Sequence, residues 1–166
     1  MPFALRKIKK QRWFPNEPSW LKNNDFVADP LADLNTSQGS LSVWKIEDDQ
    51  SNLAMIIAAL ASTLEHPSHL DYALLDIQEI LNASFKLEPR RGDTKYPEAD
   101  RYHLDIIELS ASKLVALCHL MLQKAAKDRF SKPKVKQLLI DAVKQGKIQP
   151  LQLSKDLQDW IKEEGP

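Results

Sequence analysis

Four histidines and one cysteine are the side chains of this protein best suited to proton transfer, metal binding or nucleophilic attack. His66 and His69 flank Pro67 in a turn, but a transition-metal site needs three or four ligands in a fixed geometry. His103 falls on an apolar stripe, where a nearby acid such as Asp100 could share its proton. A histidine held structurally in or near the core is the simpler interpretation. We therefore predict no metal site, and we keep an enzyme with a His-centred site at His103 as an alternative.

The remaining catalytic patterns are missing or badly placed. Cys118 lies among Leu114, Leu117 and Met121, a setting typical of a small hydrophobic side chain rather than of an activated thiol. The sequence holds no GxGxxG, P-loop or GxSxG pattern. We therefore expect no cofactor, assign no catalytic residue and favour a noncatalytic protein.

The first 25 residues combine basic and aromatic side chains and are the stronger candidate for binding. Six lysines and arginines in this segment oppose one Glu and one Asp, and prolines argue against a long helix. Arginine and tryptophan often anchor protein interfaces. We predict a basic aromatic arm over residues 1–25, with these contact residues: Arg6, Lys7, Lys9, Lys10, Arg12, Trp13 and Trp20.

Two further basic groups could contact an anion or a nucleic acid. One is the Arg90–Arg91 pair in a Pro-Gly loop, and the other is the segment 124–147, with eight Lys or Arg residues against two Asp. Lysine contacts to phosphates give affinity that depends on salt and little on sequence. No aromatic residue lies between Phe130 and Trp160, so base stacking is not supported there. The predicted contacts are Arg90, Arg91, Lys132, Lys134 and Lys136.

Whole-chain composition sets the class of protein. The 166 residues carry 23 basic and 23 acidic side chains, so net charge gives no overall attraction to nucleic acid. One cysteine cannot form an internal disulfide, which fits a cytoplasmic protein. The longest apolar run covers residues 53–61, whereas a membrane helix needs about 20 residues. We expect no membrane partner.

Apolar spacing and capping residues then predict the elements. A hairpin is expected over residues 31–47, with its second strand at residues 41–46 after a turn that contains Gly39. Helices are expected over residues 51–64, 70–81, 97–127, 131–146 and 154–165. The second helix has an alternative, a strand over residues 72–77 that runs into a short helix.

These elements predict an α+β fold that is predominantly helical, with four or five helices and a small antiparallel sheet or hairpin. Residues 26–166 would form the single globular domain behind the arm. The preferred function is a noncatalytic protein-interaction or adaptor domain, such as a small subunit of a larger complex, with another protein as partner. The first alternative is nucleic-acid binding through the arm and the segment 124–147.

Overall fold

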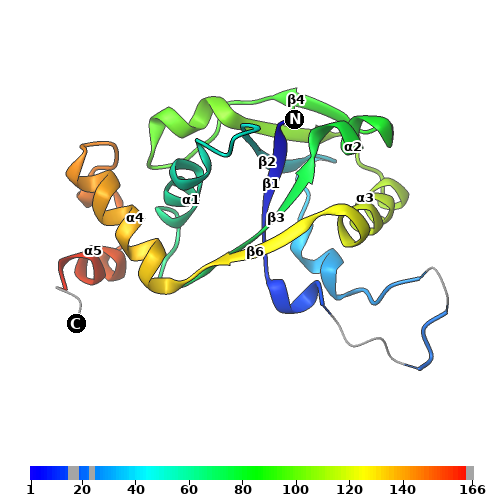
Figure 1. Ribbon diagram of the computed structural model, residues 1–166, viewed down its shortest axis with the longest axis horizontal. Coiled ribbons are helices and arrows are strands. Elements are labelled where there is room, and N and C mark those ends of the chain that lie inside the picture. Colours follow the sequence, from blue (N-terminus) through cyan, green and yellow to red (C-terminus); the bar gives the residue numbers. More distant parts are fainter. Residues whose placement is uncertain (15–18, 23–24, 164–166) are drawn as a thin grey trace.

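The computed structural model describes residues 1–14, 19–22 and 25–163, and a six-stranded sheet lies at its centre (Figure 1). Every neighbouring pair of strands is antiparallel, in the order β4-β5-β2-β1-β3-β6. The strands are β1 (Phe3–Ile8), β2 (Leu41–Ile46), β3 (Leu70–Asp76), β4 (Lys86–Pro89), β5 (His103–Ile107) and β6 (Ala126–Phe130). The prediction of a small sheet or hairpin on a helical bundle is therefore wrong: the fold is mixed α+β, organised around a full sheet.

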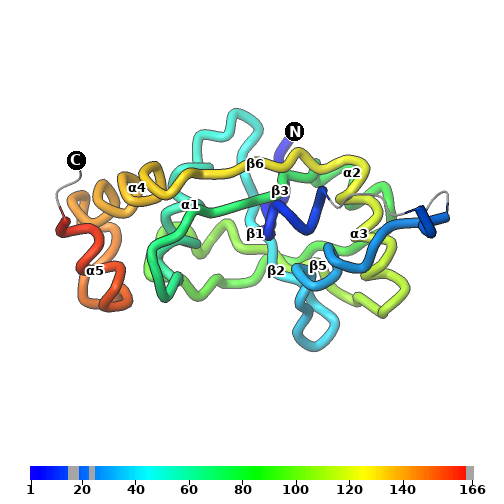
Figure 2. Tube along the Cα trace, turned by 90° about the horizontal axis from the view of Figure 1, so that it is seen from below, coloured from blue at the N-terminus to red at the C-terminus, as the bar shows by residue number. Residues whose placement is uncertain are grey.

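Helices cover both faces of this sheet. The α-helices are α1 (Leu53–Ala61), α2 (Ile77–Asn82), α3 (Ala111–Lys124), α4 (Lys132–Lys144) and α5 (Lys155–Lys162). Short 3-10 helices add η1 (Lys10–Arg12), η2 (Asp29–Asp33), η3 (Pro97–Tyr102) and η4 (Pro150–Gln152). In both views α4 and α5 lie beyond α1 at one end of the molecule, and α3 lies at the opposite end (Figures 1 and 2).

Strand β2 explains why the sheet needs helices on both faces. Its residues alternate between two apolar clusters: Leu41 and Val43 pack with the α3 side, while Trp44 and Ile46 pack with the α1 side. Side chains that follow each other along a strand point to opposite faces, so a strand apolar on both faces must be covered twice. The strand over residues 41–46 therefore packs against an apolar cluster on each face of the sheet.

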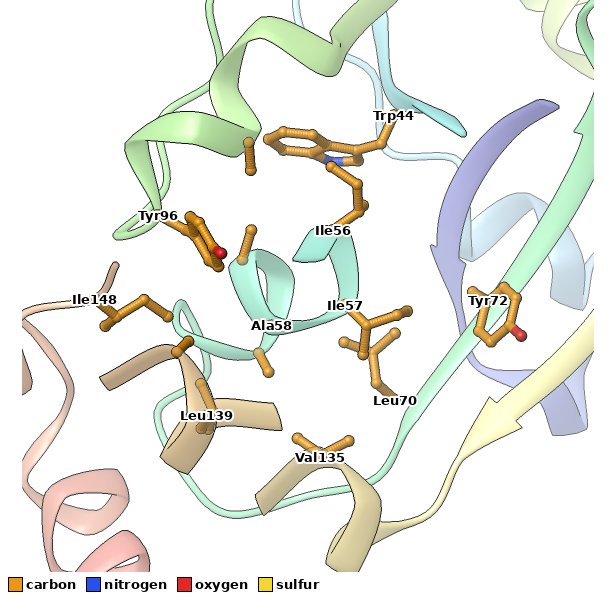
Figure 3. Close-up of a cluster of buried hydrophobic side chains, with 14 of the residues drawn as sticks. Trp44, Ile56, Ile57, Ala58, Leu70, Tyr72, Tyr96, Val135, Leu139 and Ile148 are labelled. Carbon is orange, nitrogen blue, oxygen red and sulfur yellow. The ribbon is translucent and has the colours of Figure 1, made fainter. Parts of the chain in front are cut away.

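The cluster on the α1 side joins the sheet to the helical end of the molecule (Figure 3). Ile56 and Ile57 of α1 are fully buried, and α4 adds Val135 and Leu139. Trp44 lies over Ile56 at the sheet side of the cluster (Figure 3). Each fully buried side chain of this size contributes about 1.5–3 kcal/mol to folding. This burial fixes α1 over β2, next to the site described below.

Two predicted elements are wrong. The segment expected as the first hairpin strand, near Leu31, belongs to η2, so only the second strand exists. The long helix predicted over residues 97–127 is divided into η3, β5 and α3. His103 of β5 pairs with Trp44 of β2. The helix α3 starts only after Ser110, whose hydroxyl accepts from the N–H of Lys113 at 3.3 Å. Pairing with β2 therefore overrides the helical spacing of these apolar residues.

Other predictions that rest on capping and turn residues agree with the structure. Residues 70–82 follow the strand-plus-helix alternative, because Asp76 ends β3 and its carboxylate accepts from the N–H of Gln78 at 2.7 Å. Ser154 caps α5, and Gly146 follows α4 with φ +69°, a value that glycine adopts readily. The segment predicted as an N-terminal arm contributes β1, which lies between β2 and β3.

Candidate anion-binding site

Neighbouring strands β1 and β2 pair along only half of their length. The first three residues of β1 pair with the last three of β2, whereas all six residues of β1 pair with β3. The side chain of Arg6 bridges the unpaired part: Nη1 donates to the carbonyl oxygen of Ser42 at 2.8 Å, and Nη2 donates to that of Asp33 at 3.0 Å. Burial lowers the pKa of Arg6, and the charge of Asp33 opposes this shift. We call this unpaired region the β1–β2 split.

Asp33 organises the wall of the split. Its Oδ2 accepts from the backbone N–H of Lys9 at 2.7 Å and from Nε1 of Trp13 at 2.9 Å. Its Oδ1 accepts from Nη1 of Arg12 at 2.7 Å. The Asp33 side chain is only 6% exposed, so these donors replace its hydration. One carboxylate therefore holds η2 against the chain that leaves β1.

A pocket of about 580 Å³ opens at this split. Its walls come from β1, η2, β2, the end of α1 and the loop at residues 91–94. The cationic side chains that line it are Arg6, Lys7, Lys9, Arg12 and Arg91, and the carboxylates are Asp33 and Asp93. Five cations against two anions make this basic pocket a site of positive potential.

Four of the five cations form no ion pair among the described residues. Arg6 donates to backbone carbonyl oxygens instead, and Lys7, Lys9 and Arg91 are not in any ion pair, whereas Arg12 pairs with Asp33. Burial, followed by the charges of Arg6 and Lys9, lowers the pKa of Lys7. An anion in the pocket would offset this repulsion and satisfy donors that the fold leaves free.

The loop that presents Arg91 is fixed by its neighbour Gly92. The N–H of Gly92 donates to the carbonyl oxygen of Asp100 at 3.3 Å. A Cβ at Gly92 would lie 2.7 Å from Cη2 of Trp44 and 3.0 Å from Oδ1 of Asp100, so a larger residue would displace the loop. Arg91 is exposed beside this anchor. A free guanidinium on a fixed loop is suited to binding an external anion.

His103 borders the same pocket, in a structural setting. It is buried, its Nδ1 lies 3.0 Å from the carbonyl oxygen of Arg90, and its ring packs edge-on against Trp44 with centroids 4.9 Å apart. Its Nε2 lies 3.8 Å from Oδ1 of Asp105, and the hydroxyl of Ser42 donates to that same oxygen at 3.3 Å. A hydroxyl nucleophile needs a base that accepts its proton and can release it. Here the hydroxyl faces the carboxylate rather than the imidazole.

The other residues predicted for the arm have different places. Trp13 is 2% exposed and donates to Asp33 in the wall of the β1–β2 split, whereas Trp20 is 72% exposed. Lys10 lies over the Phe14 ring at 6.0 Å from its centroid, and Lys127 lies 5.7 Å from the same centroid. The two predicted basic segments therefore meet at Phe14, outside the pocket.

The remaining predicted anion contacts are divided among separate places. Arg90 is bound to Asp105 at 2.8 Å, so of the arginine pair only Arg91 is free of an ion pair in the described structure. Lys132, Lys134 and Lys136 lie on α4, beyond α1. These three lysines and the basic pocket therefore do not form one surface.

Sequence reasoning missed Asp33, Gly92 and Thr94 as parts of the site. Asp33 gave no local signal, because its partners lie 20 or more residues away in the chain. A glycine directly after Arg91 was the available sign of a tightly packed loop. Thr94 helps to hold that loop, since its hydroxyl donates to Oδ1 of Asp100 at 3.0 Å.

No group of three or more His, Cys, Asp or Glu side chains in the described ranges could hold a metal ion. Across these ranges, every helix is too short or too polar to cross a membrane. No family model, curated protein or solved structure matches the chain.

Proposed function

We propose that this protein is a noncatalytic interaction domain that binds an acidic or phosphorylated segment of a partner protein in the basic pocket. The observation that carries the proposal is the gathering of five cations from separate parts of the chain around one cavity. Clusters of arginine and lysine recognise acidic and phosphorylated motifs by charge-assisted hydrogen bonds. The proposed setting is the cytoplasm, where a buried free thiol such as Cys118 stays reduced.

A peptide segment fits this site better than a nucleic acid does. Among the described residues that line the pocket, no aromatic ring is exposed for a base to stack on, since Trp44 is 7% exposed. Nucleic acids favour an extended basic stripe, but in the segment 124–147 several cations have partners within the fold. Lys124 pairs with Glu79, Arg129 with Asp71 and Lys147 with Glu98.

The His-centred enzyme is a weaker explanation of the same pocket. His103 lines the pocket, but its Nδ1 is bound to a backbone carbonyl and its Nε2 faces the carboxylate of Asp105. Among the described residues that line the cavity, the ionic groups without an ion pair are four cations and the carboxylate of Asp93, and the cations can bind an anion without reacting. Binding is therefore the chemistry that the arrangement favours.

Calorimetric titration with a short polyglutamate peptide that carries one central serine, either unmodified or phosphorylated, tests this proposal. We expect at least one form to bind at low salt and to weaken toward about 0.15 M salt. Tighter binding of the phosphorylated form would assign the pocket to phosphate, and equal binding would assign it to carboxylates. No binding of either form at low salt would refute the proposal.

Arg91→Ala and Lys9→Ala test whether the basic pocket is the binding site. Both side chains lack an ion pair in the described structure, so their removal should leave folding unchanged. Each should weaken peptide binding about five- to thirty-fold, the effect of losing about 1–2 kcal/mol of charge-assisted hydrogen bonding. Lys95→Ala, an exposed lysine outside the pocket, is the matched control. An equal effect of all three variants would contradict this location.

A further inference from the structure

Helix α4 has two faces with different surroundings. Val135, Leu139 and Ala142 are buried on the face toward α1. A second stripe repeats every four residues, through Lys132, Lys136, Ile140 and Lys144, and remains at least partly exposed. Residues four apart lie on the same side of a helix, so three lysines surround one isoleucine along a line of about 18 Å.

This stripe forms a groove with α5. The groove has a volume of about 800 Å³. Its apolar lining includes Ile140 of α4 and Trp160 and Ile161 of α5. Lysines from both helices surround this lining: Lys132, Lys136, Lys144 and Lys162. We call it the α4–α5 groove, and it shares no residue with the basic pocket.

The lysines of the groove carry positive charge that the described fold does not neutralise. Among the described residues none of the four forms an ion pair, although Glu163 also lines the groove. The Nζ of Lys136 donates to the backbone carbonyl oxygen of Glu163 at 2.6 Å, and Lys132 lies 5.8 Å from the centroid of Trp160. These contacts orient the two ammonium groups without removing their charge.

We propose that the α4–α5 groove docks an acidic amphipathic helix of a partner protein. The partly exposed Ile140 and Ile161, which pack beside the buried Trp160, would cover the apolar side of such a helix, and the lysines of the groove would pair with its flanking glutamates or aspartates. The length of the α4 stripe matches about three turns of helix. A nucleic acid would bind the lysines but leave the apolar lining uncovered, so an acidic helix complements more of the surface.

Calorimetric titration of the full chain with a synthetic helical peptide tests the docking site. The peptide carries leucines on one side and glutamates beside them, and the control peptide replaces every glutamate by lysine. Lys144→Glu should weaken binding about tenfold or more, because a paired cation becomes a repelling anion. Lys134→Glu is the matched control, since Lys134 is exposed on the same helix but outside the groove. It should change the affinity less than about twofold.

Further variants separate the groove from the basic pocket and test its apolar lining. Ile140→Ala should weaken the acidic peptide about fivefold while circular dichroism shows a folded protein. In a protein that already carries Arg91→Ala, which weakens the basic pocket, Lys144→Glu should still weaken binding of the leucine-bearing acidic peptide, so failure of one site does not decide the other. Equal effects of Lys134→Glu and Lys144→Glu, equal binding of the lysine peptide, or binding of a DNA duplex in place of the acidic peptide would overturn the proposal.

Discussion

Removing the carboxylate of Asp33 should destabilise the fold through three donors at once. In Asp33→Ala the buried Nε1–H of Trp13 loses its acceptor, a change that costs about 1–3 kcal/mol. The N–H of Lys9 and the guanidinium of Arg12 also lose their partner, but Arg12 is 32% exposed and water replaces much of that contact. We expect the free energy of unfolding to fall by about 3 kcal/mol in total.

Urea unfolding followed by circular dichroism measures this change, with the urea dependence of the free energy compared between variants. Asp33→Asn should cost about 2 kcal/mol, since an amide oxygen in the place of Oδ2 still accepts from Lys9 and Trp13 but the amide N–H₂ faces the guanidinium of Arg12. Asp29→Ala, on the same 3-10 helix, is the control and should change stability by less than about 0.5 kcal/mol, because Asp29 is exposed.

A double-mutant cycle isolates the buried contact. Trp13→Phe removes the indole N–H, and its coupling with Asp33→Ala should be about 1 kcal/mol. A cost below about 1 kcal/mol for Asp33→Ala, or no coupling to Trp13, would refute the reasoning that this carboxylate holds η2 to the end of β1.

Three further predictions each concern a single residue. Burial raises the pKa of Cys118 to about 12, so a disulfide reagent at mildly alkaline pH should label this thiol only after urea unfolding, and labelling of the native protein would contradict its burial. Burial alone would raise the pKa of Asp71, but hydrogen bonds from Arg129 and a backbone N–H outweigh it and the pKa lies below its ordinary value. Because this pKa is lowered on folding, the stabilisation is present above the unfolded pKa of about 3.9 and is lost as pH falls through the folded pKa. Asp71→Asn should therefore lower stability at pH 7 and remove this part of the acid sensitivity in urea unfolding, and an unchanged acid profile would contradict the assignment. Gly92→Ala should cost about 1–3 kcal/mol through contact with Trp44 and weaken acidic peptides at the basic pocket, and a wild-type melting curve would contradict the packing.

Local signals in the sequence predicted helix ends better than they predicted strands. Ser154 and Gly146 act through neighbours a few residues away, so their roles could be read from the sequence. His103 depends on Trp44 in the paired strand, and this contact joins distant parts of the chain. Apolar residues at helical spacing in residues 103–107 therefore indicated a helix, although their alternation fits a strand equally well.

The residues of the candidate site were also only partly predictable, because its contacts join distant parts of the chain. Arg6, Lys7 and Lys9 were predicted as contacts because of their type, and they line the pocket together with Arg91. Their meeting with Arg91 could not be read from the sequence, since it depends on the pairing of β1, β2 and β5. Asp33 carried no signal for the same reason.

The position of β1 sets a condition on how the chain is made. Its two neighbours in the sheet are both synthesised later, and Phe3 cannot meet Asp76 until the ribosome has passed β3. Pairings so distant in sequence form slowly, so β1 spends time with two open edges. Unpaired strands associate with other chains, and closely spaced lysines and arginines oppose this association. Arg6 and Lys7, two of the cations that charge the pocket, lie in β1, so the same side chains oppose association of this strand with other chains before its partners are translated.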